Sequence, residues 1–337
     1  MIPEIGHFAL ILALLLAAVQ GVLPIVGAAR GNTVWMAMAR PAAQGQFTFV
    51  AIAFGCLAWS FINNDFSVLN VATNSNSQLP LQYRIAATWG SHEGSLLLWV
   101  LMLNVWTAAV TVFSRHLPES MAARVIGVLG LVGVGFILFL LLTSNPFERL
   151  LPAAADGRDL NPLLQNYWMV IHPPTLFLGF ASTLVPFAFA IAALWKKDFT
   201  GWLKPVLPWT LFNGAVLGTG IMMGGAWAYE SLSFGGYWAW DPVENASLVP
   251  WLIMIAGIHT LLAAQKTGHS LRITFVFFLL SFLLMLYSSF LTRSGALQNT
   301  SVHAFTDEGM KIHLLIFLFS FIVLAKLLIL EIGRASC

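Results

Sequence analysis

Long apolar runs, separated by shorter polar segments, dominate this sequence and limit it to one class of fold. A hydrocarbon core about 30 Å thick is crossed by roughly 17 to 25 apolar residues, and a helix is the way an isolated segment satisfies its own backbone there. Charged residues make up only 9% of the chain, against about a quarter in soluble domains. We predict an all-α, polytopic bundle of about nine transmembrane helices, forming one domain over residues 1–337, with spans at 5–29, 47–62, 95–113, 125–143, 173–195, 208–227, 247–264, 273–291 and 312–330.

The distribution of Lys and Arg predicts the orientation. With the N-terminus outside, eleven of the 16 cationic residues fall on the inner side, as the positive-inside rule favours. No basic residue precedes Arg30, so the first run lacks the cationic start of a signal peptide, and we expect it to be retained as a helix. The five outer cations are Arg84, Arg149, Arg158, Arg293 and Lys311.

The predicted outer segments are long and the inner ones short, which places function on the outer side. They cover residues 63–94, 144–172, 228–246 and 292–311. Within the second, residues 161–171 have apolar residues at near-helical spacing and predict a short amphipathic helix lying on the membrane. The net charge of +2 and the absence of basic arms give no reason to expect nucleic acid. Cys56 and Cys337 form no disulfide or zinc pattern.

The segment from Trp227 to Trp251 contains seven aromatic residues in 25 positions and no Lys or Arg. Its centre, 228–246, is a predicted outer loop that can present flat aromatic faces to a large planar ligand. The alternative is a belt of aromatic residues at the headgroup level. Trp238 and Trp240 would lie on one face of an extended segment.

The end of this loop matches the start of a helix. Gly235 and Gly236 provide backbone freedom, and Asp241, Pro242 and Glu244 fit N-cap, N1 and N3 of a capping box. Plain capping is an alternative to a binding role for Asp241 and Glu244.

Three histidines fall in predicted outer segments: His92, His172 and His303. His172 precedes Pro173, which disfavours helical conformation, so we expect it at the mouth of the helix starting at Pro173. Imidazole is a common axial ligand of haem iron, and two imidazoles on opposite faces make a bis-His site. For any one of these histidines, the alternative is a hydrogen-bonding residue at the membrane interface.

Taken together, these motifs resemble the CcmF family, the haem lyase subunit of the bacterial cytochrome c maturation system. The resemblance is carried by the "WWD" segment Gly235-Gly236-Tyr237-Trp238-Ala239-Trp240-Asp241, by Trp89–Ser95, by His172-Pro173-Pro174 and by the stretch 293–305. It implies that the tryptophan-rich loop, with Trp227 and Tyr237, holds haem b from a haem chaperone. His172 and His303 would be the axial ligands. Partner subunits would present the CxxCH thiols of apocytochrome c for thioether attachment, at the outer face of the inner membrane.

The resemblance also implies a second haem b within the membrane, ligated by His259. This residue lies 12 residues into its predicted span, about 18 Å from the outer end. An ionisable residue at such depth suggests function, although a neutral histidine bonded to a carbonyl is the alternative. No other histidine lies at that depth, and CcmF proteins usually continue beyond this length. We therefore expect the N-terminal part of such a protein: either it is a truncated or split subunit, or the second haem is absent or lacks a protein ligand.

Haem propionates require a cation, and Arg293 is the first choice because it shares a predicted loop with His303. Two other functions stay open. A haem exporter or chaperone-loading protein of the WWD type would use the same loop without thioether chemistry. An ion-coupled transporter has little support, since His259 is almost the only ionisable residue deep in a span.

Overall fold

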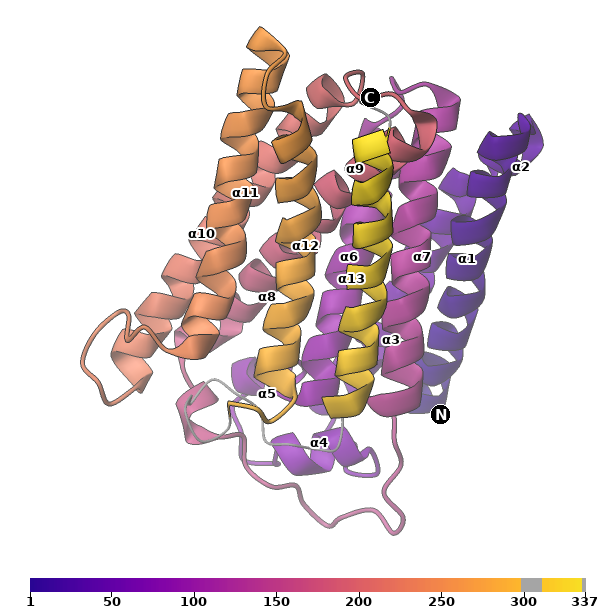
Figure 1. The fold of residues 1–337 in the computed structure, drawn as a ribbon. Coiled ribbons are helices and arrows are strands. Elements are labelled where there is room, and N and C mark those ends of the chain that lie inside the picture. The colour runs from indigo at the N-terminus through magenta and orange to yellow at the C-terminus, as the bar shows by residue number, and fades with distance from the viewer. Residues whose placement is uncertain (298–310, 335–337) are drawn as a thin grey trace.

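The computed structural model describes residues 1–297 and 311–334, which form a bundle of long helices (Figure 1). Within these residues there is no β-strand, and eight spans are long and apolar enough to cross a membrane. The predicted all-α transmembrane fold is thus confirmed. The helices are α1 (Ile2–Arg30), α2 (Thr33–Ala37), α3 (Ala39–Ile62), α4 (Leu69–Asn74), α5 (Leu81–Ala87), α6 (His92–Phe113), α7 (Glu119–Thr143), the 3-10 helix η1 (Pro162–Leu164), α8 (Tyr167–Ser182), α9 (Leu184–Lys196), α10 (Leu203–Ser231), α11 (Pro242–Thr267), α12 (Leu271–Arg293) and α13 (Lys311–Arg334).

The predicted spans mark the right helices, but several limits are wrong. The span 47–62 begins eight residues earlier, at Ala39. Polar residues in this first part, which broke the apolar pattern, have partners inside the bundle. The guanidinium of Arg40 donates to the carbonyls of Thr111 and Ser114 at the end of α6. The ninth predicted span corresponds to α13.

Two groups of helices build the bundle. α1 packs against α3 and α7, while α10 packs against α8 and α11, and α11 against α12. α6 and α9 lie between these groups, in contact with α3, α7, α8 and α12. The buried core therefore runs through the whole bundle, and the residues of α9 from Leu184 to Leu194 are all buried.

The two ends of the bundle differ. The short helices α4 and α5, the loops 144–166 and 232–241 and the N-terminus lie at one end, which we call the loop end, whereas the opposite end has α2 and short turns (Figure 1). This separation agrees with the predicted sorting of long and short connections.

The span predicted at 173–195 is two helices, α8 and α9, that meet at Thr183. Pro186 has no N–H for the carbonyl of Ser182, which weakens the helix at this point. Side chains from neighbouring helices donate to carbonyls just before the break. The Trp106 indole donates to Leu178 (2.8 Å) and the Asn213 amide to Gly179 (2.9 Å). Non-helical backbone is tolerated at this depth only with such partners.

The separate amphipathic helix predicted over 161–171 is wrong. Asn161 caps the short helix η1 by accepting from the N–H of Leu163, and Asn166 caps α8 by accepting from the N–H of Trp168. Two caps five residues apart divide the segment, because each Asn side chain fixes its own start. α8 thus begins at Tyr167.

Candidate functional site

A cavity of about 810 Å³ opens at the loop end of the bundle. Its size suits a cofactor-sized ligand. One part of its wall is apolar and aromatic, from α6, α8, α10 and the tryptophan-rich loop: Trp89, Trp99, Met169, Leu176, Phe177, Phe180, Ile221, Trp227 and Trp238. The part from α4 and the loop 144–166 is polar: Asn70, Thr73, Asn74, Asn145, Glu148, Arg158 and Asn161.

His172, a predicted axial ligand, lines this cavity. Its Nδ1 lies 2.9 Å from the carbonyl oxygen of Gly220 on α10. Because a carbonyl only accepts, Nδ1 carries the proton, and the lone pair of the neutral ring is on Nε2. A carbonyl that accepts from one ring nitrogen in this way orients an imidazole whose other nitrogen binds a metal. The ring also packs over Gly224, where an added Cβ would lie 2.7 Å from Cε1.

His172 is not at the mouth of its helix, as the sequence predicted, but inside α8 with Pro173 and Pro174 after it. The two prolines lie in the first half of α8, and a side chain bonds one of the two carbonyls that they leave. Pro173 has no N–H for the carbonyl of Met169, and the indole N–H of Trp89 donates to that carbonyl instead (3.1 Å). This bond joins α8 to the turn before α6.

The predicted capping box is confirmed at the start of α11. The Asp241 carboxylate accepts from the N–H of Val243 (2.7 Å), and Glu244 Oε2 accepts from the N–H groups of Asp241 (3.1 Å) and Ala239 (2.9 Å). Glu244 thereby holds the end of the tryptophan-rich loop, and it is buried at the cavity wall.

The tryptophan-rich loop sends its aromatic residues in different directions. Trp238 lines the cavity, whereas Trp240 is 71% exposed and has a φ of 58°. The prediction of one extended segment is therefore wrong at Trp240, although the two rings form an edge-to-face pair at 6.1 Å. Tyr237 stacks on Tyr229 of α10 outside the cavity, with ring centroids 4.5 Å apart.

Hydrogen bonds at both sides of the tryptophan-rich loop hold it in place, and one of its glycines allows it to turn. The Trp227 indole lines the cavity and donates to the carbonyl of Leu163 (3.0 Å). Gly235 has a φ of 70° and uses the predicted freedom; Gly236 has a negative φ and does not need it. On the outside, Glu230 accepts from Asn166 and from the Trp168 indole, both at 3.0 Å, which ties the end of α10 to the start of α8.

Four polar atoms of the cavity wall are buried and have no hydrogen-bond partner within the described part of the chain. They are Asn70 Nδ2, Trp99 Nε1, Trp238 Nε1 and Glu244 Oε1. A buried polar group without a partner costs about 1–3 kcal/mol. Such atoms at one cavity indicate that a polar part of a ligand, or water, completes their bonds.

The motif Trp89–Ser95 builds the turn into α6. Ser91 is the N-cap and accepts from the N–H of Gly94 (3.0 Å). Gly94 has to be glycine, because a Cβ would lie 1.9 Å from the Thr88 carbonyl oxygen. His92, expected in an outer loop, is buried as the first residue of α6.

Arg293, the predicted partner of an anionic ligand, is buried at the end of α12 and bonds this same turn. Its guanidinium donates to the His92 carbonyl (2.8 Å), to His92 Nδ1 (3.1 Å) and to Ser95 Oγ (2.8 Å). His92 Nε2 in turn lies 3.2 Å from the Arg293 carbonyl and donates to it. Arg293 reaches the cavity wall, but much of its hydrogen-bonding capacity serves the junction of α6 with α12.

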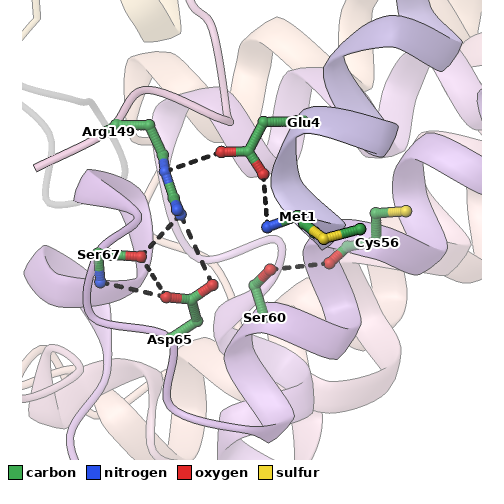
Figure 2. Close-up of polar contacts among 7 residues, drawn as sticks. All are labelled: Met1, Glu4, Cys56, Ser60, Asp65, Ser67 and Arg149. Carbon is green, nitrogen blue, oxygen red and sulfur yellow. Dashed lines mark hydrogen bonds and ion pairs between the residues drawn. The ribbon is translucent and has the colours of Figure 1, made fainter.

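Two other arginines of the loop end also have protein partners. Arg149 pairs with Glu4 (3.1 Å) and Asp65 (3.7 Å) and donates to Ser67 (2.7 Å), in the cluster shown in Figure 2. Arg84 donates to the carbonyl of Ile62 (3.0 Å). Arg158 lines the cavity, and its guanidinium has no bond or ion pair to any described residue.

The structure tests only one of the two remaining predicted ligands. His303 lies outside the described residues. His259 is exposed on α11, and its Nδ1 donates to the carbonyl of Ile255 in the same helix (2.8 Å). No group of three His, Cys, Asp or Glu side chains suited to a metal ion occurs in the described ranges.

The sequence did not single out several residues of this site. Trp99 and Phe180 resemble other span residues in the sequence, and Asn70 resembles other loop residues; Arg158 was one of the four outer arginines, behind Arg293 as the first choice. Only their meeting at one cavity distinguishes them. The unusual density of polar side chains between Asn70 and Asn76 was a signal that could have drawn attention to α4.

Comparisons with known proteins agree with these features. Residues 89–297 match the family model described as cytochrome C assembly protein. The chain is 54% identical over 310 residues to the cytochrome c-type biogenesis protein CcmF of Pseudomonas aeruginosa, covering 91% of this chain and 47% of the relative. Against CcmF of Escherichia coli K12, identity is 48% over 311 residues, with 91% and 48% covered. A solved structure titled cytochrome c heme lyase CcmF superposes with a TM-score of 0.82 at 30% identity, covering all of this chain and 51% of the other. The chain thus spans about half the length of the relatives that it matches.

Proposed function

Because this chain belongs to the cytochrome c assembly protein family and, within it, to the CcmF proteins, we propose that it binds haem in the loop-end cavity as the substrate of a cytochrome c haem lyase. The observation that carries this proposal is His172, anchored through Nδ1 to Gly220, in a cavity of about 810 Å³ with indole walls. Haem b is large, flat and mostly apolar, which suits such walls, and imidazole is one of the common axial ligands of its iron.

The residues present fit this substrate. His172 supplies Nε2 as one axial ligand, and we propose His303 as the other. Trp89, Trp227 and Trp238 would contact the porphyrin face or edge, since their rings line the cavity. The N–H groups of Trp99 and Trp238, which have no partner among the described residues, are donors for its polar substituents.

We further propose that bound haem is presented to a second substrate, the CxxCH segment of apocytochrome c. In thioether formation each cysteine sulfur bonds to one vinyl carbon while a proton goes to the other. A haem chaperone would deliver the haem, and thiol-handling subunits would deliver the peptide. The chain itself would hold and orient the porphyrin. A haem exporter or chaperone-loading role would lack the thioether product.

A haem titration of the purified chain tests the proposal. We expect a low-spin, six-coordinate spectrum, and replacing His172 or His303 by Gly should open an axial position that added imidazole refills. His116→Gly, in the turn between α6 and α7, is the matched control and should leave the spectrum unchanged. If both ligand variants keep the parent spectrum, the proposal fails. Thioether product formed with partner subunits and apocytochrome separates the lyase from the exporter.

We also propose that the chain spans the bacterial inner membrane with its N-terminus and loop end outside. The excess of Lys and Arg at the other end supports this orientation. Reporter fusions near Asp156 and Phe234 should report the outside, and fusions after Arg115, Lys197 and Lys266 the cytoplasm. The reverse pattern would put the cavity on the cytoplasmic side, away from the proposed place of haem attachment.

A further inference from the structure

One arginine of the loop end, Arg158, has no side-chain partner among the residues that the structure describes. Of the four arginines predicted on this side, Arg84, Arg149 and Arg293 have the protein partners described above. Arg158 is exposed at the cavity wall, and its side chain has no hydrogen bond or ion pair to the described residues. A long cationic side chain with such freedom is usually only a solvated surface group. Whether Arg158 has a binding role therefore has to be judged from its position at the cavity.

The backbone that carries Arg158 is fixed at three consecutive positions. The Asp156 carboxylate accepts from the N–H (2.9 Å) and hydroxyl (2.6 Å) of Ser77. Gly157 lies so close to α4 that a Cβ there would be 2.0 Å from the Ser75 carbonyl oxygen. The N–H of Arg158 then donates to the carbonyl of Ala72 (2.8 Å).

The same segment is anchored on the other side of Arg158. Leu160 is buried and packs against Gly90, in the turn before α6. Arg158 therefore stands on a fixed stretch between α4 and this turn, both of which line the cavity. A loop that needed only a soluble surface residue at this position would not require its backbone to be held on both sides.

The surroundings of Arg158 suit an anion that enters with an apolar body. Asn70, on the helix that holds the Arg158 backbone, has a buried Nδ2 without a partner in the described part of the chain. An amide N–H₂ and a guanidinium are both donors, and together they suit a carboxylate. The carboxylates of Glu93 and Glu148 also line the cavity, but neither is within ion-pair distance of Arg158.

We propose that Arg158 is the carboxylate-binding residue of the cavity and binds a propionate of the porphyrin, with Asn70 as a second donor. This assignment rests on the proposed function, and it gives the propionate a partner other than the predicted Arg293. Arg293 instead keeps the α6–α12 junction together. Because Arg158 acts at the rim, its loss should weaken binding without changing the iron ligands.

Titration of the full chain in detergent with haem and with haem dimethyl ester tests the assignment. The ester keeps the ring and the iron but has no carboxylate. We expect Arg158→Gln to weaken haem binding about tenfold, as for the loss of a charge-assisted hydrogen bond, and to leave ester binding unchanged. Arg158→Lys, which keeps the charge, should retain part of the preference for haem. Arg84→Gln is the matched control and should change neither affinity.

Three outcomes would overturn the assignment. Equal weakening of haem and ester by Arg158→Gln would mean that the residue only supports the loop. If haem affinity is unchanged in Arg158→Gln while the spectrum is still lost in His172→Gly, Arg158 has no role in binding and the proposed function stands. If the parent chain does not bind haem, both the role of Arg158 and the proposed function are refuted.

Discussion

His172 and His259 have the same local chemistry in opposite surroundings. Each ring donates from Nδ1 to a backbone carbonyl, at 2.9 Å and 2.8 Å, which puts the lone pair on Nε2. For His172 the carbonyl belongs to another helix, α10, and the ring lies in a cavity. For His259 the carbonyl belongs to its own helix, and the ring lies on the exposed surface of α11.

The difference shows what makes a histidine part of a site. A bond within one helix fixes a tautomer but supplies no walls, whereas a bond between helices fixes the ring relative to other elements. The described residues form no walls around the exposed ring of His259. A ligand at His172 would be enclosed by α6, α8, α10 and α11. Of the two proposed haem sites, the one at His172 is therefore the one for which the described residues form walls.

The largest expected effect separates the two histidines directly. Haem bound to the purified chain should lose its low-spin spectrum in His172→Gly and keep it in His259→Gly, because, of these two histidines, His172 is the one that lines the cavity. A single imidazole in hydrocarbon would leave a second haem five-coordinate and easily lost. Absorbance spectroscopy and a haem-to-protein ratio measure both effects. A stoichiometric second low-spin haem that disappears in His259→Gly would contradict the comparison.

A smaller effect is expected where the cavity meets α10. Gly224→Ala would place a methyl group 2.7 Å from His172 Cε1, so the ring has to move or rotate. Overpacking of this kind costs about 1–3 kcal/mol, and we expect haem affinity to fall by roughly tenfold or more. Gly55→Ala in α3, where nothing lies within 4 Å of the added Cβ, is the control. Equal affinities for the two variants would show that His172 is not held against Gly224.

The sequence allowed the fold to be predicted well because long apolar helices are local features. It placed the capping box at Asp241 and Glu244 for the same reason, since a cap depends on neighbours three residues apart. The sequence-based prediction failed where the local structure depends on a hydrogen bond to a residue far away in the sequence. The carbonyl bonds made by Trp89 and Asn213 allow proline and a helix break inside a span, and the contacts of Arg293 with His92 cross 201 positions of sequence.

The two tryptophans of the loop sharpen the picture of the cavity wall. Trp238→Ala should weaken haem binding by about 0.5–1.5 kcal/mol, the usual value of an aromatic contact. Trp240→Ala should have a smaller effect, because that ring is 71% exposed and contributes only its edge-to-face contact with Trp238. Titrations of both variants with haem measure the difference. A larger loss for Trp240 would mean that the loop turns over when haem binds.

The smallest expected effect is a pH dependence confined to the loop that carries Arg158. Hydrogen bonds from the Ser77 hydroxyl, the Ser77 N–H and the Gly157 N–H lower the pKa of Asp156 below the usual value of a carboxyl. A group whose pKa is lower in the folded state stabilises that state above its unfolded pKa, and the contribution is lost as the pH falls through the folded pKa. Amide exchange of Arg158, whose N–H is bonded to Ala72, should therefore quicken, relative to other loop amides, as the medium is acidified past that range. Asp156→Asn should remove this dependence, while Asp198→Asn, in the turn before α10, should leave it in place. If the Arg158 amide has the same acid dependence in the parent and in Asp156→Asn, then Asp156 does not hold the arginine at the cavity.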